Sequence, residues 1–150
     1  MELKIPPPIV AALFALTMWG MATIATFAAL TIHVSWVVSL VLLVVALAID
    51  FFALISFQIA KTTINPMQPH KASQLVVVGI YKFTRNPMYL GLAVIMLAFV
   101  IWFGNLINIA LLFTFVWYIT QYQIIPEERA LVKLFGDDFI AYQSSVRRWI

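Results

Sequence analysis

The sequence predicts an all-α integral membrane protein with four transmembrane helices, a cytoplasmic connector and a C-terminal amphipathic helical tail. Of its 150 residues, 64% are hydrophobic and 10% are charged, and the mean hydropathy is +1.02. A soluble domain usually carries about a quarter charged residues, so this chain cannot cover a surface that faces water. Its length allows one membrane domain. The expected spans are residues 9–30, 36–59, 88–103 and 106–125, followed by the tail, residues 126–150.

The first two expected spans are both of crossing length. Three prolines precede the first span, and proline suits the approach to a helix. The uncharged run from Ile9 to Leu30 matches the roughly 20 residues of a membrane helix. A signal peptide would have an apolar core of only about 7–15 residues, so this run is interpreted as a span. A polar break, Thr31 to Ser35, separates it from the second span.

Asp50 is the one charged residue inside an expected span. An acid at membrane depth is costly and is by default a functional candidate, so Asp50 is a candidate to bind a substrate head group or to relay a proton. The alternatives are an interhelical hydrogen bond, or a position near enough to the cytoplasmic end to reach water. The sequence leaves these interpretations open.

The hydrophilic connector from Lys61 to Ser73 leads to a polar stretch between Gly79 and Gly91. This stretch gathers charges, tyrosines, an amide and a proline where the third expected span begins. Polar groups at such a boundary need partners, because burying them unpaired is costly. Gly104-Asn105 breaks the chain between the third and fourth spans. Both spans are short, which predicts a tight helical hairpin.

Beyond Pro126 the chain becomes amphipathic. Apolar residues between Leu131 and Val146 recur near helical spacing. Gly136, followed by two aspartates, predicts a helix stop and a restart. Residues 146–150 combine two arginines with a tryptophan, which suits a membrane interface.

The positive charges predict the orientation of the spans. All nine lysines and arginines fall in the N-terminal stretch, between the second and third spans, or in the tail. Cytoplasmic segments are rich in these residues, so both termini and the polar stretch are expected on the cytoplasmic side. The net charge of +3 is therefore explained by the orientation of the spans in the membrane, and no nucleic-acid partner is expected. Cysteine is absent and the two histidines are well separated, so no metal site is expected.

Several side chains of the polar stretch have the chemistry of a ligand site. Tyr81 and Tyr89 offer rings and hydroxyls, and Arg85 offers a planar fork for a carboxylate. Pro87 at a helix start leaves backbone N–H groups for an anion, and Glu128 can pair with a ligand cation. The alternative is that the tyrosines anchor helices at the interface and Arg85 reports topology. The residues alone leave both interpretations open.

Two blocks of the sequence resemble a known family. The first runs Gly79-Ile80-Tyr81 and then Arg85-Asn86-Pro87-Met88-Tyr89-Leu90-Gly91. It is similar to the Gly-x-Tyr…Arg-His/Asn-Pro-x-Tyr-x-Gly signature of the isoprenylcysteine carboxyl methyltransferase family, which is related to the phospholipid N-methyltransferases. The family's second motif is similar to Glu127-Glu128-x-x-Leu131…Phe135-Gly136-Asp137-Asp138-Phe139-x-x-Tyr142. Order and spacing agree from about Asn65 onward.

The resemblance implies S-adenosylmethionine as cofactor, bound on the cytosolic side between the spans and the tail. Glu128 matches the carboxylate that holds the cofactor's amino group, and Asn86 stands where the eukaryotic enzymes have histidine. Two positions depart from the family. Ile124 replaces an arginine implicated in substrate binding, which weakens the expectation of a prenylcysteine substrate, and Ser73 stands where histidine is frequent. The cofactor-binding candidates are Leu75, Val76, Tyr81, Asn86, Pro87, Tyr89 and Glu128, and the catalytic candidates are Arg85 and Glu128.

The expected function is S-adenosylmethionine-dependent methyl transfer at a membrane, in bacteria or archaea the inner membrane, to a lipophilic or amphiphilic acceptor such as a membrane lipid. Methyl transfer from a sulfonium needs positioning and exclusion of water, and it requires no metal. The chain has no Gly-x-Gly-x-x-Gly turn of a Rossmann-type enzyme. One alternative is a small proton-coupled four-helix transporter that uses Asp50. Another is a reductase with a nicotinamide cofactor, for which the chain looks too short.

Overall fold

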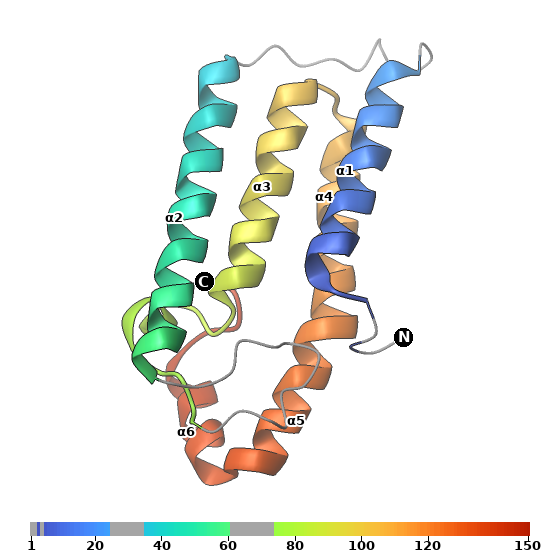
Figure 1. Cartoon of the computed structure of the whole chain (residues 1–150). Coiled ribbons are helices and arrows are strands. Elements are labelled where there is room, and N and C mark those ends of the chain that lie inside the picture. Colours follow the sequence, from blue (N-terminus) through green and yellow to red (C-terminus); the bar gives the residue numbers. More distant parts are fainter. Residues whose placement is uncertain (1–2, 4, 25–34, 61–73) are drawn as a thin grey trace.

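The computed structural model describes residues 3, 5–24, 35–60 and 74–150, and among these it contains helices and no strand (Figure 1). The expected all-α class is therefore confirmed for the described residues. The connector, residues 61–73, lies outside them. The long helices are α1 (Pro7–Thr23), α2 (Trp36–Ala60), α3 (Pro87–Phe103), α4 (Ile107–Ile119), α5 (Ile125–Phe135) and α6 (Asp137–Ser145). A short 3-10 helix, η3 (Gly79–Lys82), precedes α3, and a π-helical turn, η4 (Thr120–Ile124), joins α4 to α5.

Within the described residues, two helices are long and apolar enough to cross a membrane. One is α2, with 25 residues, and the other is the continuous helix Ile107–Phe135, with 29 residues, which comprises α4, η4 and α5. α1 and α3 are also apolar but have 17 residues each, fewer than the roughly 20 of a full crossing. Residues 25–30 of the first expected span lie outside the described part of the chain. Length and composition thus fit a membrane protein, and four complete crossings stay a prediction.

The helices α1 to α4 lie side by side, and α5 and α6 extend beyond one end of this bundle (Figure 1). α3 is the central helix, because it packs against α1, α2 and α4. Met18, Met96 and Phe115 are fully buried between α1, α3 and α4, and the ring of Phe14 meets Phe115 edge-on at 5.4 Å. The side-chain amide of Asn108 donates to the carbonyl of Met18 at 3.3 Å and ties α4 to α1.

α2 and α3 are in close contact because α2 turns small side chains inward. Small residues let membrane helices approach each other where lipid offers no hydrophobic force between them. Gly91 of α3 marks a close approach, since a Cβ at this position would overlap the Asp50 carboxylate. Oδ1 of Asp50 is buried without a hydrogen-bond partner, so this atom does not form the interhelical hydrogen bond considered for Asp50. The buried residues of α2 are Ser39, Ala46, Ala53 and Ser56.

Glycine ends two helices where the sequence predicts breaks. Gly104 ends α3 in the left-handed conformation, with φ of 60°, and its N–H closes the last turn. Oδ1 of Asn105 then accepts the N–H of Ile107, the first residue of α4, at 2.9 Å, an Asx-type turn that leads into the helix. Gly136, with φ of 54°, separates α5 from α6. The predicted stop and restart in the tail is thus confirmed.

Pro126 does not end a helix, although the sequence suggests a boundary there. Proline has no N–H and its ring crowds the preceding turn, so it normally breaks or kinks a helix interior. In this chain the preceding turn widens, and the N–H of Ile125 donates to the carbonyl of Thr120, five residues back. The expected boundary between the fourth span and the tail therefore falls inside one continuous helix. Glu127 and Glu128 lie on this helix just after the π-helical turn.

Candidate active site

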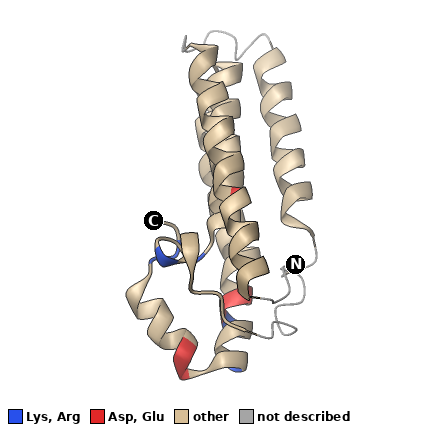
Figure 2. Cartoon of the chain, turned by 60° about the vertical axis from the view of Figure 1, so that its left-hand side comes forward, with Lys and Arg blue, Asp and Glu red and all other residues tan. Residues whose placement is uncertain are grey.

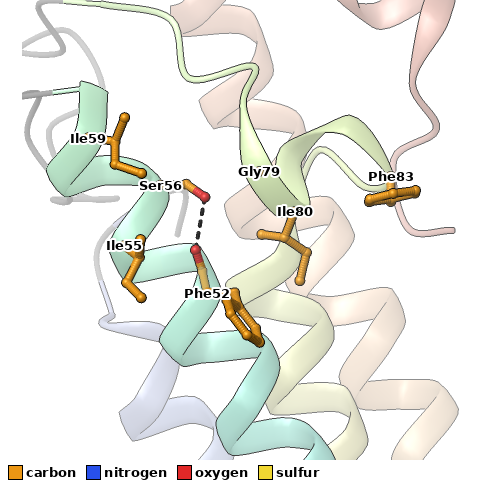
Figure 3. Close-up of a pocket in the computed structure, with 7 residues that line it drawn as sticks. All are labelled: Phe52, Ile55, Ser56, Ile59, Gly79, Ile80 and Phe83. Carbon is orange, nitrogen blue, oxygen red and sulfur yellow. Dashed lines mark hydrogen bonds between the residues drawn. The ribbon is translucent and has the colours of Figure 1, made fainter.

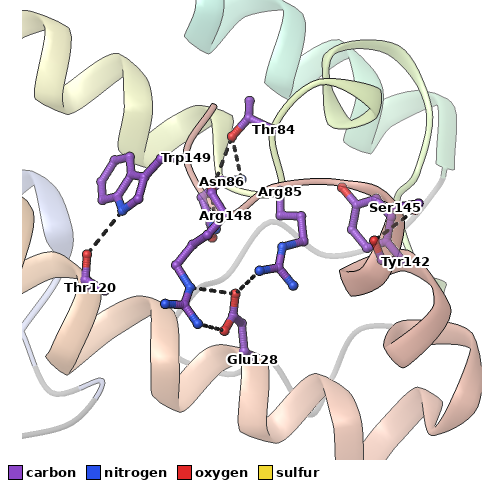
Figure 4. A network of polar contacts seen from close by, with 9 residues as sticks. All are labelled: Thr84, Arg85, Asn86, Thr120, Glu128, Tyr142, Ser145, Arg148 and Trp149. Atoms are coloured by element: carbon purple, nitrogen blue, oxygen red, sulfur yellow. Dashed lines mark hydrogen bonds and ion pairs between the residues drawn. The ribbon is translucent and has the colours of Figure 1, made fainter.

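Most of the charged residues in the described part of the chain lie around the end of the bundle from which α5 and α6 extend (Figure 2). Three chain segments that are distant in sequence meet there: the turn before α3, the start of α5, and residues 146–150 after α6. Figure 4 shows their polar side chains directed toward one another. This cluster combines both sequence blocks on which the resemblance depends.

Glu128 is the centre of the cluster. The guanidinium of Arg148 forms a fork of two hydrogen bonds with the Glu128 carboxylate, with Nε 3.1 Å from Oε1 and Nη2 2.7 Å from Oε2 (Figure 4). Arg85 adds a contact of 3.2 Å between its Nη2 and Oε1. A two-point contact between guanidinium and carboxylate is stronger and more directional than a single one. The hydrogen bonds to Glu128 raise the pKa of Arg148 above its usual value, so this guanidinium stays charged.

Glu127 points to a different neighbour from Glu128, because consecutive helical residues are about 100° apart around the axis. The hydroxyl of Tyr89, in the first turn of α3, donates to Oε2 of Glu127 at 2.9 Å. Tyr89 itself is buried in the core between the helices. The bond therefore joins the start of α3 to the start of α5, and the partner of Glu127 is a neutral hydroxyl.

The turn before α3 is fixed by its own side chains and by residues 147 and 148. Thr84 Oγ1 accepts the N–H of Asn86 at 3.2 Å, and Pro87 then begins α3, where a missing N–H costs nothing. The side chain of Asn86 donates to the carbonyl of Arg148 at 2.9 Å. The backbone N–H of Arg85 donates to the carbonyl of Arg147 at 3.1 Å.

Tyr81 belongs mainly to the packing between η3 and α2. Its buried ring meets Phe57 of α2 edge-on at 5.5 Å and clusters with Val76 and Ala53. Its carbonyl accepts the hydroxyl of Tyr142 at 2.6 Å. Burial raises the pKa of the Tyr81 and Tyr142 phenols above the ordinary value, so both remain protonated donors. This pair holds α6 against the turn that carries Arg85.

The structure brings together some of the predicted site residues and separates others. Arg85, Asn86, Tyr89 and Glu128 meet in the cluster, and Pro87 starts the helix that carries Tyr89. The other candidates lie apart: the side chain of Val76 and the ring of Tyr81 pack toward α2, Leu75 is half-buried in the loop before η3, and Asp50 faces Gly91. Ser73 and the connector lie outside the described residues.

Sequence reasoning missed Arg148 and Trp149. It assigned residues 146–150 to a membrane interface and did not expect these two side chains to contact the cluster. Arg148 binds Glu128, and the indole N–H of Trp149 donates to Thr120 Oγ1 at 3.2 Å while the ring packs against the core (Figure 4). A signal existed, because two adjacent glutamates face a site to which the motif supplies only Arg85. Buried carboxylates call for cationic partners, and the tail offers Arg147 and Arg148.

An apolar groove lies beside the turn that carries Arg85 (Figure 3). It has a volume of about 440 Å³ and is open on one side. Its polar side chain, Ser56, already donates its hydroxyl to the carbonyl of Phe52 at 2.8 Å. Gly79, with φ of 60°, closes one end, and a Cβ there would lie 2.5 Å from Ser56 Oγ. The lining residues are Phe52, Ile55, Ser56, Ile59, Gly79, Ile80 and Phe83.

A family model described as phospholipid methyltransferase matches residues 34–138, more than half of the chain and including both sequence blocks up to Asp138. The chain belongs to the phospholipid methyltransferase family. This membership confirms the resemblance seen in the motifs, and it points to a membrane methyltransferase. No comparison supports a transporter. Among the described residues, no group of His, Asp and Glu side chains could hold a metal ion.

Two relatives align with parts of this chain. An uncharacterized protein of Haemophilus influenzae is 41% identical over 63 residues, which are 42% of this chain and all of that protein. The protein-S-isoprenylcysteine O-methyltransferase of Schizosaccharomyces pombe is 32% identical over 77 residues. That alignment covers 51% of this chain but only 33% of the yeast protein. No solved structure shows a significant match.

Proposed function

We propose that this phospholipid methyltransferase family member transfers a methyl group from S-adenosylmethionine to a lipophilic or amphiphilic acceptor in the membrane. The observation that carries the proposal is the meeting of the two motif blocks at one buried polar cluster. Arg85 and Tyr89 from the first block contact Glu128 and Glu127 from the second. Packing alone would not require four ionisable side chains here, since burying charges is costly.

The residues of the cluster fit the charges of S-adenosylmethionine, which carries an ammonium, a sulfonium and a carboxylate. Glu127 and Glu128 supply negative charge for the cationic groups. Arg85 supplies donors for the carboxylate: its side chain is only 10% exposed, and its Nε and Nη1 atoms are buried without a hydrogen-bond partner. Buried donors are rarely left unpaired in native structures, so these N–H groups favour an anionic ligand. Figure 4 shows that the other terminal nitrogen of the Arg85 guanidinium, which does not contact Glu128, points away from this carboxylate.

The bound cofactor would supply an activated methyl group on sulfur. The residues of this chain would bind, orient and enclose it. Glu127 and Glu128 would hold the cationic groups, Arg85 the carboxylate, and the Tyr89 hydroxyl would keep Glu127 in position. Such positioning, with water excluded, is what an in-line displacement needs from a protein.

The acceptor is proposed to reach the site from the apolar side of the protein. The groove along α2 and η3 offers an apolar surface for a hydrocarbon chain, next to the turn that carries Arg85. Ile124, which replaces the family's arginine, is fully buried in the apolar core, so it offers nothing to a substrate carboxylate. Asp50 remains a candidate for a head-group contact because its Oδ1 has no partner. The positive charges support a cytoplasmic site, in bacteria or archaea at the inner membrane.

The first prediction is that detergent-solubilised protein binds S-adenosylhomocysteine, measured by calorimetric titration. The Glu127→Gln variant should bind at least about tenfold more weakly, because a hydrogen bond to a charged group contributes about 1.5–3 kcal/mol. Tyr89→Phe should weaken binding less, since it removes only the hydroxyl that positions Glu127.

Asp138→Asn is the matched control, because Asp138 is an exposed acid at the start of α6 and should leave the affinity unchanged. Folded wild-type protein that does not bind S-adenosylhomocysteine would refute the proposed cofactor. Equal affinity in wild type, Glu127→Gln and Tyr89→Phe would refute the site.

A further inference from the structure

Residues 146–150, here called the strap, leave α6 and return across the cluster to the core. The carbonyls of Arg147 and Arg148 accept hydrogen bonds from Arg85 N–H and Asn86 Nδ2, at 3.1 and 2.9 Å. Trp149 anchors the strap on the π-helical turn through its indole N–H. The strap is therefore held by its backbone, by Trp149 and by the two-point contact between Arg148 and Glu128.

The side chain of Arg148 covers the carboxylate that the cofactor's ammonium would need. Its two nitrogens occupy both oxygens of Glu128, and Arg85 takes a further position on Oε1. Glu128 is 8% exposed, so there is little room for another donor while Arg148 stays in place. A guanidinium and an ammonium are both cationic donors, and they would compete for the same oxygens.

We propose that the strap is a built-in competitor of the cofactor: Arg148 takes the place of the cofactor's ammonium on Glu128, and cofactor binding displaces it. This inference rests on the proposed function. It deepens that function by adding a regulatory step, since the fraction of molecules with a displaced strap sets the apparent affinity.

The exchange is physically feasible because Glu128 would keep a counter-charge throughout. When Arg148 leaves, Arg85 remains on Oε1, and the incoming ammonium replaces the lost cation. The Arg148 side chain is 38% exposed, against 10% for Arg85, so water can solvate it as it moves away. A partly exposed ion pair is also weaker than a buried one. Arg85 is thus the permanent partner of Glu128, and Arg148 is the exchangeable one.

The strap lies at the surface beyond α6 and has no regular secondary structure of its own. Arg147 is exposed, and Ile150 is 78% exposed. Segments near the surface that lack regular secondary structure open at a lower cost in free energy than core helices. A ligand that binds only the open form has its apparent dissociation constant raised by the inverse of the open fraction. An open fraction of about a tenth would weaken binding about tenfold.

The test is titration of S-adenosylhomocysteine into wild type, Arg148→Gln and Arg147→Gln. Arg148→Gln removes the competing guanidinium but keeps the backbone contacts of the strap, and it should bind several-fold to about tenfold more tightly. Arg147→Gln is the matched control, since it loses the same charge one residue away on an exposed side chain, and it should bind like wild type.

A second measurement follows the strap directly and does not depend on any substitution of Arg148. The chain has no cysteine, so Ile150→Cys gives one site for a spin label. The label should become more mobile on addition of S-adenosylhomocysteine. If Arg148→Gln does not fold, Arg148→Lys replaces it, because lysine keeps the charge but cannot form the fork. Its affinity should exceed that of wild type.

The outcomes separate the two proposals. Unchanged or weaker binding in a folded Arg148 variant, or a label that stays equally mobile, would overturn the competition and leave the proposed function intact. Absence of binding in folded wild type and in all variants would refute the proposed cofactor, and the competition with it. Tighter binding in Arg148→Gln alone, with a mobilised label, supports the strap as competitor.

Discussion

Replacing Glu128 by glutamine is expected to destabilise the folded protein by about 3 kcal/mol or more. The Arg85 side chain is 10% exposed, and its ion pair with Glu128 at 3.2 Å supplies its counter-charge. Removing one partner of a buried ion pair typically costs about 3–5 kcal/mol, because the other charge stays buried and uncompensated. Arg148 adds less, since its more exposed guanidinium can turn toward water. Thermal and denaturant unfolding of the purified protein in detergent would measure the loss.

The double variant Glu128→Gln/Arg85→Gln separates this explanation from a general loss of packing. It removes both charges of the pair and should recover much of the stability lost in Glu128→Gln. Asp138→Asn again serves as control, with an expected change near zero. Wild-type stability in Glu128→Gln, or no recovery in the double variant, would contradict the buried pair. A weaker affinity for cofactor in Glu128→Gln therefore cannot be attributed to a lost contact alone, and Glu127→Gln is the cleaner variant for binding.

Replacing Gly91 by alanine is expected to destabilise the protein by about 1–3 kcal/mol, the usual cost of forcing an extra group into a packed interface. A Cβ at this position would overlap both carboxylate oxygens and Cγ of Asp50, across the contact between α2 and α3. The aspartate side chain is short, so it cannot simply turn aside. Either the helices separate or the side chain leaves its rotamer. The melting temperature of the detergent-solubilised protein is the measurement.

Asp50→Ala should rescue the Gly91→Ala variant, because it removes the atoms that collide. Alone, Asp50→Ala should be neutral or stabilising, since it removes an acid whose Oδ1 has no partner. Gly20→Ala in α1 is the matched control: nothing lies within 4 Å of the new Cβ, and alanine is the better helix former. Equal effects of the two glycine substitutions, or absence of rescue, would show that Gly91 is not required by Asp50.

The helices could be predicted from the sequence because their signals are local. Apolar runs placed α2 and α3, and Pro87, Gly104 and Gly136 marked ends that the structure confirms. The π-helical turn before Pro126 could not be read in the same way, because it inserts a residue that shifts the periodicity. Spacing also did not tell which apolar residues of the tail are buried: Leu134 lies near helical spacing with its neighbours, yet it is 42% exposed.

The site could be predicted only in part, for a related reason. The two motif blocks identified Arg85, Tyr89 and Glu128 as residues that would meet, and they do. The fork between Arg148 and Glu128 depends on the path of the chain through α6 and back, which no local pattern specifies. A motif names a tyrosine but does not say which way its ring points. The packing of Tyr81 against Phe57 could therefore not be predicted from the sequence.

The unbroken helix from Ile107 to Phe135 makes the two glutamates the far end of a single rod. A rod slides and turns as a whole, whereas Arg85 and Tyr89 are attached to its neighbour α3. An axial slip of one residue between the two would be about 1.5 Å, more than the Glu127–Tyr89 hydrogen bond tolerates. Bilayer thickness acts on how membrane helices tilt and seat themselves. For helices that cross a bilayer, a change in its thickness is therefore expected to move the two glutamates relative to Arg85 and Tyr89, without any lipid having to touch them.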